Sequence, residues 1–256
     1  MIVQGMLLTD PARTPELGWI RVQGPSETEP GRILELAYGE LPSDLGPPAL
    51  GGRDRILCPA FTDAHFHVPQ IQSVGVDGLH LLEWLDTVIF PAESWWGRGG
   101  AISSARTAAR RLIREGTCGV AGYLTSHAEG SRDAAMFWAR RTPLRFHLGR
   151  SAMDRHAPDD LTREDRERAE RRPIPSPLLA PIDVAPRQKR RFISANPRFA
   201  VSCSAELLAE RITQRKSPDD PVVLLGDFNA LPHNPAITTL VSRAGLADVW
   251  RHNHPA

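Results

Sequence analysis

The sequence is poor in cysteine, and this shortage excludes some small-protein architectures. Its three cysteines, Cys58, Cys118 and Cys203, stand far apart among 256 residues and form no Cys-x-x-Cys pair. A disulfide framework or a structural zinc knuckle requires an even number of cysteines or close cysteine pairs. We therefore expect three buried thiols in a reducing compartment.

An excess of either charge is also missing, and so are long apolar runs. The 31 basic residues nearly balance the 30 acidic ones, which argues against a partner selected by bulk charge, such as duplex nucleic acid or an anionic membrane. No stretch of eighteen apolar residues occurs, and the first residues, MIVQGMLLTDPART, lack the pattern of a signal peptide. We expect a soluble, cytoplasmic protein without a membrane partner.

The chain does contain enough apolar residues, 41%, for a globular core, and its texture changes along its length. Residues 1–57 hold short alternating segments broken by Pro and Gly, which predicts a small β-structured part. Residues 58–213 then alternate between strand-like and helix-like patterns. Such an order predicts a parallel sheet or barrel with its chemistry at the carboxyl ends of the strands.

Within that alternation, several segments have a defined pattern. Residues 102–116 predict an amphipathic helix with Gly116 as its stop, and 131–141 predict a helix capped by Ser131. Strands are predicted at 118–124, 143–153 and 197–203, and an exposed helix at 162–172. The apolar face expected for the first helix is Ile102, Ala105, Ala109, Leu112 and Ile113.

The most specific local pattern is the His-x-His of the segment CPAFTDAHFHVPQ, residues 58–70. Side chains at positions i and i+2 of a strand point to the same side, so His65 and His67 could hold one metal ion. From spacing alone, a surface pair or a hydrogen-bonded core pair is an equally open alternative. The place of the pair at the start of a βα array favours the metal role.

These residues, with LLEWLDTVIFPAE, EGTCGVAGYLTSH, MDRHAPDDL and NPRFAVSCSAELL further along, resemble the guanine deaminase branch of the amidohydrolase superfamily. The resemblance covers residues 1–210. It implies an α/β fold: a partial TIM-barrel-like (β/α) amidohydrolase barrel at 58–213, with the small β-structured part before it.

The resemblance implies zinc-dependent hydrolytic deamination of a purine base. It assigns His65 and His67 as zinc ligands. It also places His67 and Gln70 against the substrate, together with Arg198 and Phe199 of the Pro-Arg-Phe motif. A neutral amide can both donate to and accept from a purine edge, and an aromatic face suits a flat ring. The alternative is that Arg198 is a surface cation and Phe199 a core residue.

Three other residues carry weaker signals. Trp84 is typical of a core residue rather than of a pocket wall, and Asp154 and His156 are consistent with polar groups of a loop.

The resemblance also implies ligands that this sequence does not display. Another His in a His-x-x-Glu setting, then a further His and an Asp, would follow Cys203. A closed eight-stranded barrel takes about 250 residues, whereas the segment 63–213 supplies about 150. Two imidazoles leave zinc short of the three protein ligands of catalytic sites. We expect a truncated, poorly stable or inactive half-enzyme unless another chain or copy, in an oligomer, completes it.

A second resemblance concerns residues 217–256, after a polar linker at 214–220. The apolar strand beginning at Pro221 ends in Gly-Asp-Phe-Asn, and this resembles one motif of the endonuclease/exonuclease/phosphatase family. The resemblance implies a short C-terminal α/β fragment at 221–256, with Asp227 and Asn229 as catalytic residues and Mg²⁺ as cofactor. The alternative is that both residues only form the turn at the strand end. A helix is predicted at 235–243.

Three functions therefore stay open at the level of sequence, and whether the chain is an enzyme stays open with them. The first is a zinc-dependent purine deaminase. The second is a metal-dependent phosphodiesterase or nuclease, and the third is a non-catalytic truncated fusion.

Overall fold

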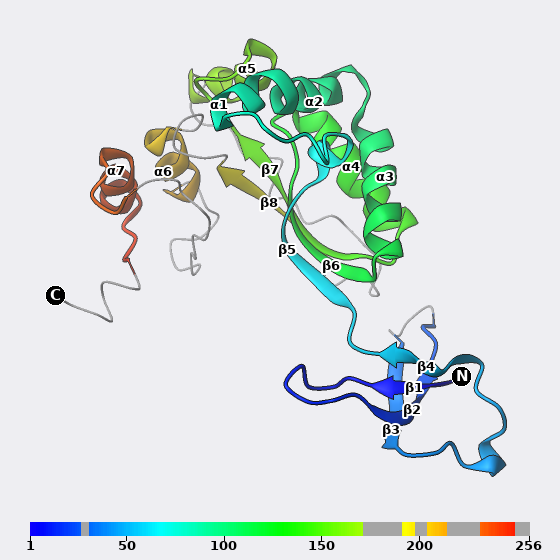
Figure 1. Cartoon of the computed structure of the whole chain (residues 1–256). Helices are drawn as coiled ribbons and strands as arrows, with labels where there is room; N and C mark the ends of the chain where they lie inside the picture. Colours follow the sequence, from blue (N-terminus) through cyan, green and yellow to red (C-terminus); the bar gives the residue numbers. More distant parts are fainter. Residues whose placement is uncertain (27–30, 171–190, 198–203, 214–230, 249–256) are drawn as a thin grey trace.

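A computed structural model describes residues 1–26, 31–170, 191–197, 204–213 and 231–248. It contains two four-stranded sheets, and the helices gather around the second one (Figure 1). The mixed α/β class with a parallel sheet, predicted from the sequence, is confirmed.

The secondary structure follows the predicted alternation. The strands are β1 (Ile2–Leu7), β2 (Glu16–Gln23), β3 (Arg32–Tyr38), β4 (Leu50–Leu57), β5 (Phe61–His67), β6 (Thr117–Tyr123), β7 (Arg145–Ala152) and β8 (Arg191–Pro197). The α-helices are α1 (Leu81–Trp84), α2 (Phe90–Ser94), α3 (Ala101–Arg114), α4 (Ala128–Arg141), α5 (Asp159–Glu170), α6 (Ala205–Thr213) and α7 (Pro235–Ala244). Shorter helical turns are Ser43–Leu45, Val68–Gln72, a π-helical turn at Leu85–Ile89, and Trp95–Arg98.

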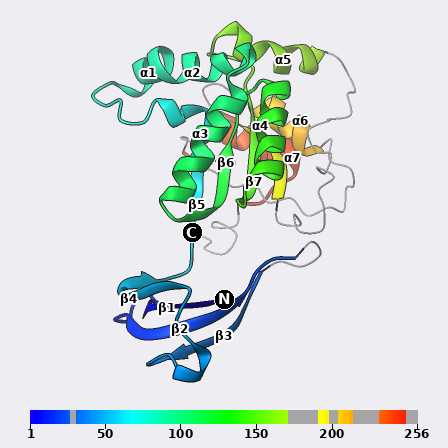
Figure 2. The ribbon, with the colours of Figure 1, turned by 90° about the vertical axis from the view of Figure 1, so that its right-hand side faces the viewer.

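The first sheet has the strand order β3-β2-β1-β4. Strand β2 pairs antiparallel with both of its neighbours, whereas β4 runs parallel to β1. Leu7 of β1 and Trp19 of β2 are its buried apolar residues, each 3% exposed. Figure 2 shows the sheet set apart from the helices, with the chain passing on from it into β5.

The second sheet has the order β5-β6-β7-β8, and all of its strands are parallel. Helices α3 and α4 cover one of its faces, where Val120, Phe146 and Leu148 pack against alanines of both helices. The indole of Trp138 donates a 2.7 Å hydrogen bond to the carbonyl oxygen of Ala105, which ties α4 to α3. This packing leaves the other face of the sheet to carry the side chains that alternate with the core residues.

Helix α3 ends before Gly116, which has φ +80°, as the sequence predicted. The predicted apolar face was only partly right. Ala105, Ala109 and Leu112 are buried, but Ile102 is 42% and Ile113 39% exposed. Buried Ala101, Ser104 and Ala108 complete the stripe instead, because only small side chains let the helix approach its neighbours closely.

Two further expectations need correction, and a third is not tested. Helix α4 begins at Ala128, so Ser131 is no cap; its hydroxyl donates to the carbonyl oxygen of Thr125 in the interior. The strand expected at 197–203 lies almost wholly outside the described residues, which end here at Pro197, the last residue of β8, and it stays a prediction. Cys58 and Cys118 are exposed rather than buried. Cys58 lies in the link between β4 and β5, Cys118 is the second residue of β6, and Cys203 lies outside the described residues.

The C-terminal part contains the predicted helix at 235–243 as α7. Asn234 caps it by accepting a 2.9 Å hydrogen bond from the amide of Ala236, and Gly245, with φ +63°, ends it. Leu240 of α7 packs against α6. Among the helices of the described residues, none has both the length and the apolar character needed to cross a membrane.

Candidate functional site

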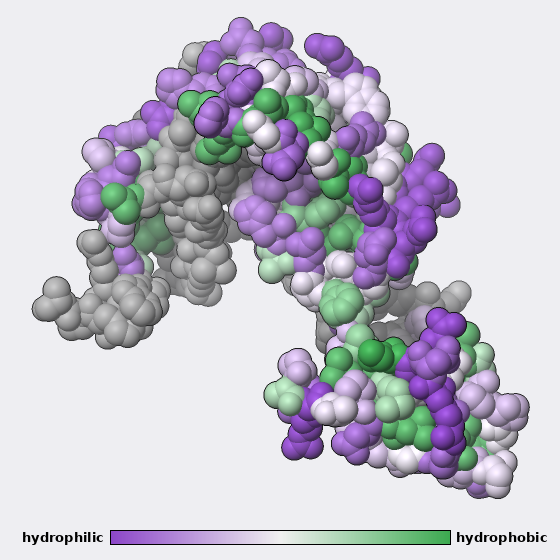
Figure 3. Space-filling view, viewed as in Figure 1, coloured by the Kyte–Doolittle hydropathy of each residue, from purple (hydrophilic) through white to green (hydrophobic). Residues whose placement is uncertain are grey.

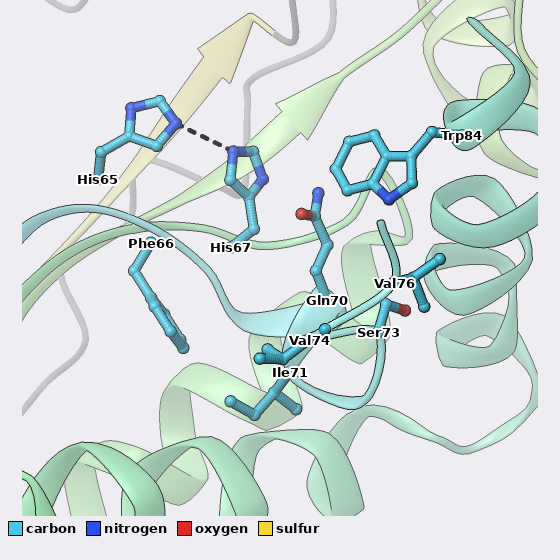
Figure 4. Close-up of a pocket in the computed structure, with 10 residues that line it drawn as sticks. His65, Phe66, His67, Gln70, Ile71, Ser73, Val74, Val76 and Trp84 are labelled. Atoms are coloured by element: carbon cyan, nitrogen blue, oxygen red, sulfur yellow. Dashed lines mark hydrogen bonds between the residues drawn. The ribbon is translucent and has the colours of Figure 1, made fainter. Parts of the chain in front are cut away.

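Two histidines meet at the carboxyl end of β5. The Nε2 atoms of His65 and His67 lie 3.2 Å apart, with ring centroids separated by 5.1 Å (Figure 4). The i, i+2 alternation of the strand turns both rings to the same side, as predicted. The Asp63 carboxylate accepts a 3.1 Å hydrogen bond from the backbone amide of His65 and steadies this end of the strand.

The neighbouring strand supplies an aromatic support for this pair. His67 stands opposite Tyr123 in the β5/β6 register. The two rings stack with centroids 4.6 Å apart and planes inclined by 10°, and the ring of His65 lies 5.2 Å from that of Tyr123. Tyr123 therefore restricts the orientation of both imidazoles.

The donor geometry of the pair is compatible with a metal ion. Two nitrogens bound to one tetrahedral zinc, each at about 2.0–2.1 Å, are separated by about 3.3–3.4 Å. The observed 3.2 Å between the Nε2 atoms is close to that separation. Within the described residues, no group of three or more His, Cys, Asp or Glu side chains converges as a metal site. These two imidazoles are therefore the nitrogen donors of this candidate site.

A pocket of about 330 Å³ adjoins the two histidines. Its walls come from β5, from the turn that follows it and from α1; the lining residues are His65, Phe66, His67, Gln70, Ile71, Ser73, Val74, Gly75, Val76 and Trp84. In Figure 4 the Gln70 amide lies between the His67 imidazole and the Trp84 indole. The pocket thus combines apolar walls with a few polar groups, the usual composition of a small-molecule site.

Gln70 is held in place by a buried acid. Its amide nitrogen donates to the Glu93 carboxylate at 3.4 Å, and Glu93 is fully buried. Because Glu93 occupies one donor of the Gln70 amide, it fixes which way the amide group faces.

The structure brings together only some of the residues predicted for the site. His65, His67 and Gln70 share the pocket. Arg198 and Phe199 lie outside the described residues, as do Asp227 and Asn229 of the Gly-Asp-Phe-Asn motif.

Of the three residues with weaker sequence signals, one lines the pocket and two lie outside it. Trp84, predicted as a core residue, lines the pocket while also packing on the cluster around Leu85. The Asp154 carboxylate binds the hydroxyl and amide of Ser204, just before α6, and so links the end of β7 to that helix. His156 is exposed and has φ +49°.

Sequence reasoning missed Tyr123 and Glu93. Tyr123 is the next-to-last residue of a predicted strand, and Glu93 ends the motif LLEWLDTVIFPAE, so both were within quoted segments. No local pattern connects either residue to the histidines or to Gln70. Only the pairing of β5 with β6 and the packing of α2 against the Val68–Gln72 turn do so.

A second polar cluster lies at the same edge of the sheet. Buried Arg150 pairs with buried Asp165 at 2.8 Å, and Glu164 lies 3.5 Å from the same guanidinium. Glu164 also accepts from the Ala128 amide at the start of α4. This network anchors α5 to the sheet and to α4.

His127, which precedes α4, belongs to this cluster. Burial lowers the pKa of its imidazole below the ordinary 6.5; the carboxylates of Glu164 and Asp160 oppose that shift, and Arg150 adds to it. The neutral imidazole is therefore the form that the folded chain prefers.

Known guanine deaminases share sequence with this chain, although no family model matches it. Guanine deaminase of Escherichia coli K12 is 33% identical over 173 residues, which cover 66% of this chain and 37% of that protein. Guanine deaminase of Dictyostelium discoideum is 31% identical over 171 residues, 60% of this chain and 34% of that protein.

The chain contains a guanine deaminase-like region. It spans only about a third of the length of these curated relatives. The activity of the whole relatives is therefore a proposal for this chain.

Two solved structures share the fold of the guanine deaminase-like region. The C. acetobutylicum guanine deaminase, solved with guanine in its active site, gives a TM-score of 0.62 at 24% identity over 83% of this chain and 49% of its own. The Bradyrhizobium japonicum guanine deaminase gives 0.62 at 20% identity over 97% and 54%. These matches give no support to the resemblance of residues 217–256 to the endonuclease/exonuclease/phosphatase family.

Proposed function

We propose that the guanine deaminase-like region binds zinc through His65 and His67 and a purine base in the adjoining pocket, as part of a hydrolytic purine deaminase site. The single observation that carries the proposal is the 3.2 Å approach of the two Nε2 atoms at the mouth of a pocket lined by Gln70. The similarity to guanine deaminases of Escherichia coli and Dictyostelium discoideum supports purine as the substrate class.

Each residue has a defined task in this proposal. His65 and His67 present neutral imidazole nitrogens to the metal, and Tyr123 keeps both rings in that orientation. Gln70, oriented by Glu93, reads the polar edge of the base through its amide. Val74, Val76 and Trp84 cover the flat faces of the base with apolar surface. A zinc ion held by His65 and His67 would supply an activated water for hydrolytic attack on the carbon that carries the exocyclic amine.

The pocket suits a base rather than a larger substrate. Its volume of about 330 Å³ lies at the lower end of the range of about 300–1,000 Å³ for small-molecule pockets. Its lining includes no Asp, Glu, Lys or Arg of the described residues, so it favours an uncharged ring over a phosphorylated one. Arg198 and Phe199, predicted to contact the base, stay predictions.

Zinc content after purification, followed by ammonia release from guanine with added zinc, tests the proposal. The unmodified chain is expected to bind zinc through His65 and His67, and to release ammonia where a second copy or another chain completes the ligand set. His65→Ala with His67→Ala is expected to abolish both. His80→Ala is the matched control, because His80 is exposed and lies outside the pocket. Gln70→Ala is expected to retain zinc but to weaken guanine binding. Absence of both zinc and ammonia from the unmodified chain contradicts the proposal.

A further inference from the structure

A second concave site lies between α3 and α4, the two helices that cover one face of the sheet. Figure 2 shows these helices side by side in front of the strands. The groove between them has a volume of about 540 Å³ and is lined by Arg106, Arg110 and Ile113 of α3 and by Phe137 and Arg141 of α4. It shares no residue with the pocket at His65, so it is independent of the proposed deaminase site.

Positive charge dominates this groove. Three guanidinium groups line it, and no Asp or Glu of the described residues does so. The Arg106 guanidinium lies 5.7 Å from the Phe137 ring centroid, in a cation–π contact that holds it over the groove. Among the described residues, none of the ion pairs involves Arg106, Arg110 or Arg141.

This concentration of charge is local. The chain as a whole carries a formal charge of only +1. Figure 3 shows strongly hydrophilic residues gathered over the outer side of α3, at the right of the view. The outer side of this helix therefore carries polar and charged groups, whereas its alanines face the sheet and α4.

The spacing of the three arginines favours a ligand with more than one anionic group. Arg106 and Arg110 are one helical turn apart on α3, and Arg141 faces them from α4. Residues at i and i+4 have Cβ atoms about 5–6 Å apart, so the two guanidinium groups can each contact a different phosphate of a di- or triphosphate. Guanidinium groups bind phosphate through paired N–H donors and, unlike lysine, match its geometry.

The groove also has an apolar part. Ile113, which is 39% exposed, and Phe137 offer hydrophobic surface beside the guanidiniums. A bare polyanion leaves this surface in water, whereas an organic group next to the phosphates covers it. We propose that the α3/α4 groove binds a nucleoside di- or triphosphate, with its phosphates on Arg106, Arg110 and Arg141 and its nucleoside along Ile113 and Phe137.

Isothermal titration calorimetry of the full chain with GDP, ADP, guanosine and pyrophosphate tests this proposal. Binding of the nucleoside diphosphates is expected, with weaker binding of pyrophosphate, no measurable binding of guanosine and a loss of affinity on raising the NaCl concentration. Arg110→Gln with Arg141→Gln is expected to weaken GDP binding by about tenfold or more, because each substitution removes charge-assisted hydrogen bonds.

The matched control is Arg114→Gln with Arg132→Gln, which removes two exposed arginines from the same helices outside the groove. Circular dichroism melts verify that both double variants fold. Equal loss of affinity in the two double variants means that general charge, not the groove, binds the nucleotide, and this overturns the proposal. Binding of poly-glutamate without binding of GDP overturns it as well, in favour of an acidic protein segment.

Discussion

The imidazole of His67 stacks on the phenol ring of Tyr123, with ring centroids 4.6 Å apart and planes inclined by 10°. The contact joins the ends of two neighbouring parallel strands, β5 and β6. Because the ring of His65 lies 5.2 Å from the same tyrosine, one side chain positions both candidate metal ligands. The proposed metal site therefore depends on Tyr123, although Tyr123 itself does not bind the metal.

Removal of this ring is expected to weaken zinc binding. Tyr123→Ala leaves the two imidazoles free to rotate, so zinc affinity is expected to fall by about tenfold, the lower range for residues that orient metal ligands. Tyr123→Phe keeps the stacked ring and is expected to bind zinc like the unmodified chain. Competition with a chromophoric chelator measures both affinities; equal losses in the two variants would contradict a stacking role.

The buried ion pair between Arg150 and Asp165 is expected to be important for stability. In Asp165→Ala, the Arg150 guanidinium, which is 2% exposed, keeps only the more distant Glu164 as an ion-pair partner. Loss of one partner of a buried ion pair lowers the free energy of unfolding by roughly 3 kcal/mol. Urea unfolding measures the difference in free energy. The control is Glu167→Ala, an exposed acid on the same helix, for which a change below about 0.5 kcal/mol is expected.

Stability is expected to fall as the pH drops through the range in which His127 titrates. Burial lowers the pKa of His127 in the folded chain below 6.5, so at mildly acidic pH the unfolded chain binds more protons than the folded one. The contribution of His127 to the free energy of unfolding is therefore complete above about pH 6.5, the ordinary pKa of histidine. It is lost as the pH falls through the lower pKa of His127 in the folded chain.

His127→Gln is expected to reduce this pH dependence. Free energies of unfolding at pH 7.5, 6.5 and 5.5 compare it with the unmodified chain and with His80→Gln, a control at an exposed position. If the His127→Gln profile parallels that of the unmodified chain, the histidine does not contribute. His147, whose pKa burial also lowers, is expected to account for part of the remaining slope.

A glycine in β4 is expected to be irreplaceable for the first sheet. Gly51 has φ +95°, and a Cβ atom there would lie 1.9 Å from the carbonyl oxygen of Gln4 on β1. Since that neighbour is backbone, Gly51→Ala must displace the β1/β4 pairing. Gly39 has φ +96° and open space where a Cβ atom would stand, so Gly39→Ala costs only the strain of about 1–2 kcal/mol. Thermal unfolding is expected to show the larger loss for Gly51→Ala.

Much of the fold was predictable because it follows from local periodicity. Alternating apolar positions identified β6 and β7, and Gly116 marked the end of α3. Which side chains of a helix are buried was less predictable. Ile113 was expected in the core and instead borders the basic groove, because the stripe that packs on α4 is made of alanines.

Local sequence was sufficient to identify the His-x-His pair and its likeness to guanine deaminases. The side-chain alternation of a single strand is enough to turn His65 and His67 to one side, and no distant contact is needed. Gln70, three residues further along, was predicted for the same site and lies there because it is close in the chain.

The surroundings of that pair depend on tertiary contacts that no local pattern predicts. Tyr123 reaches His67 through the β5/β6 register, and Glu93 reaches Gln70 through helix packing. Arg110 and Arg141 meet because α3 and α4 lie side by side on the sheet. These contacts join residues distant in the chain, and strand register and helix packing depend on the whole core.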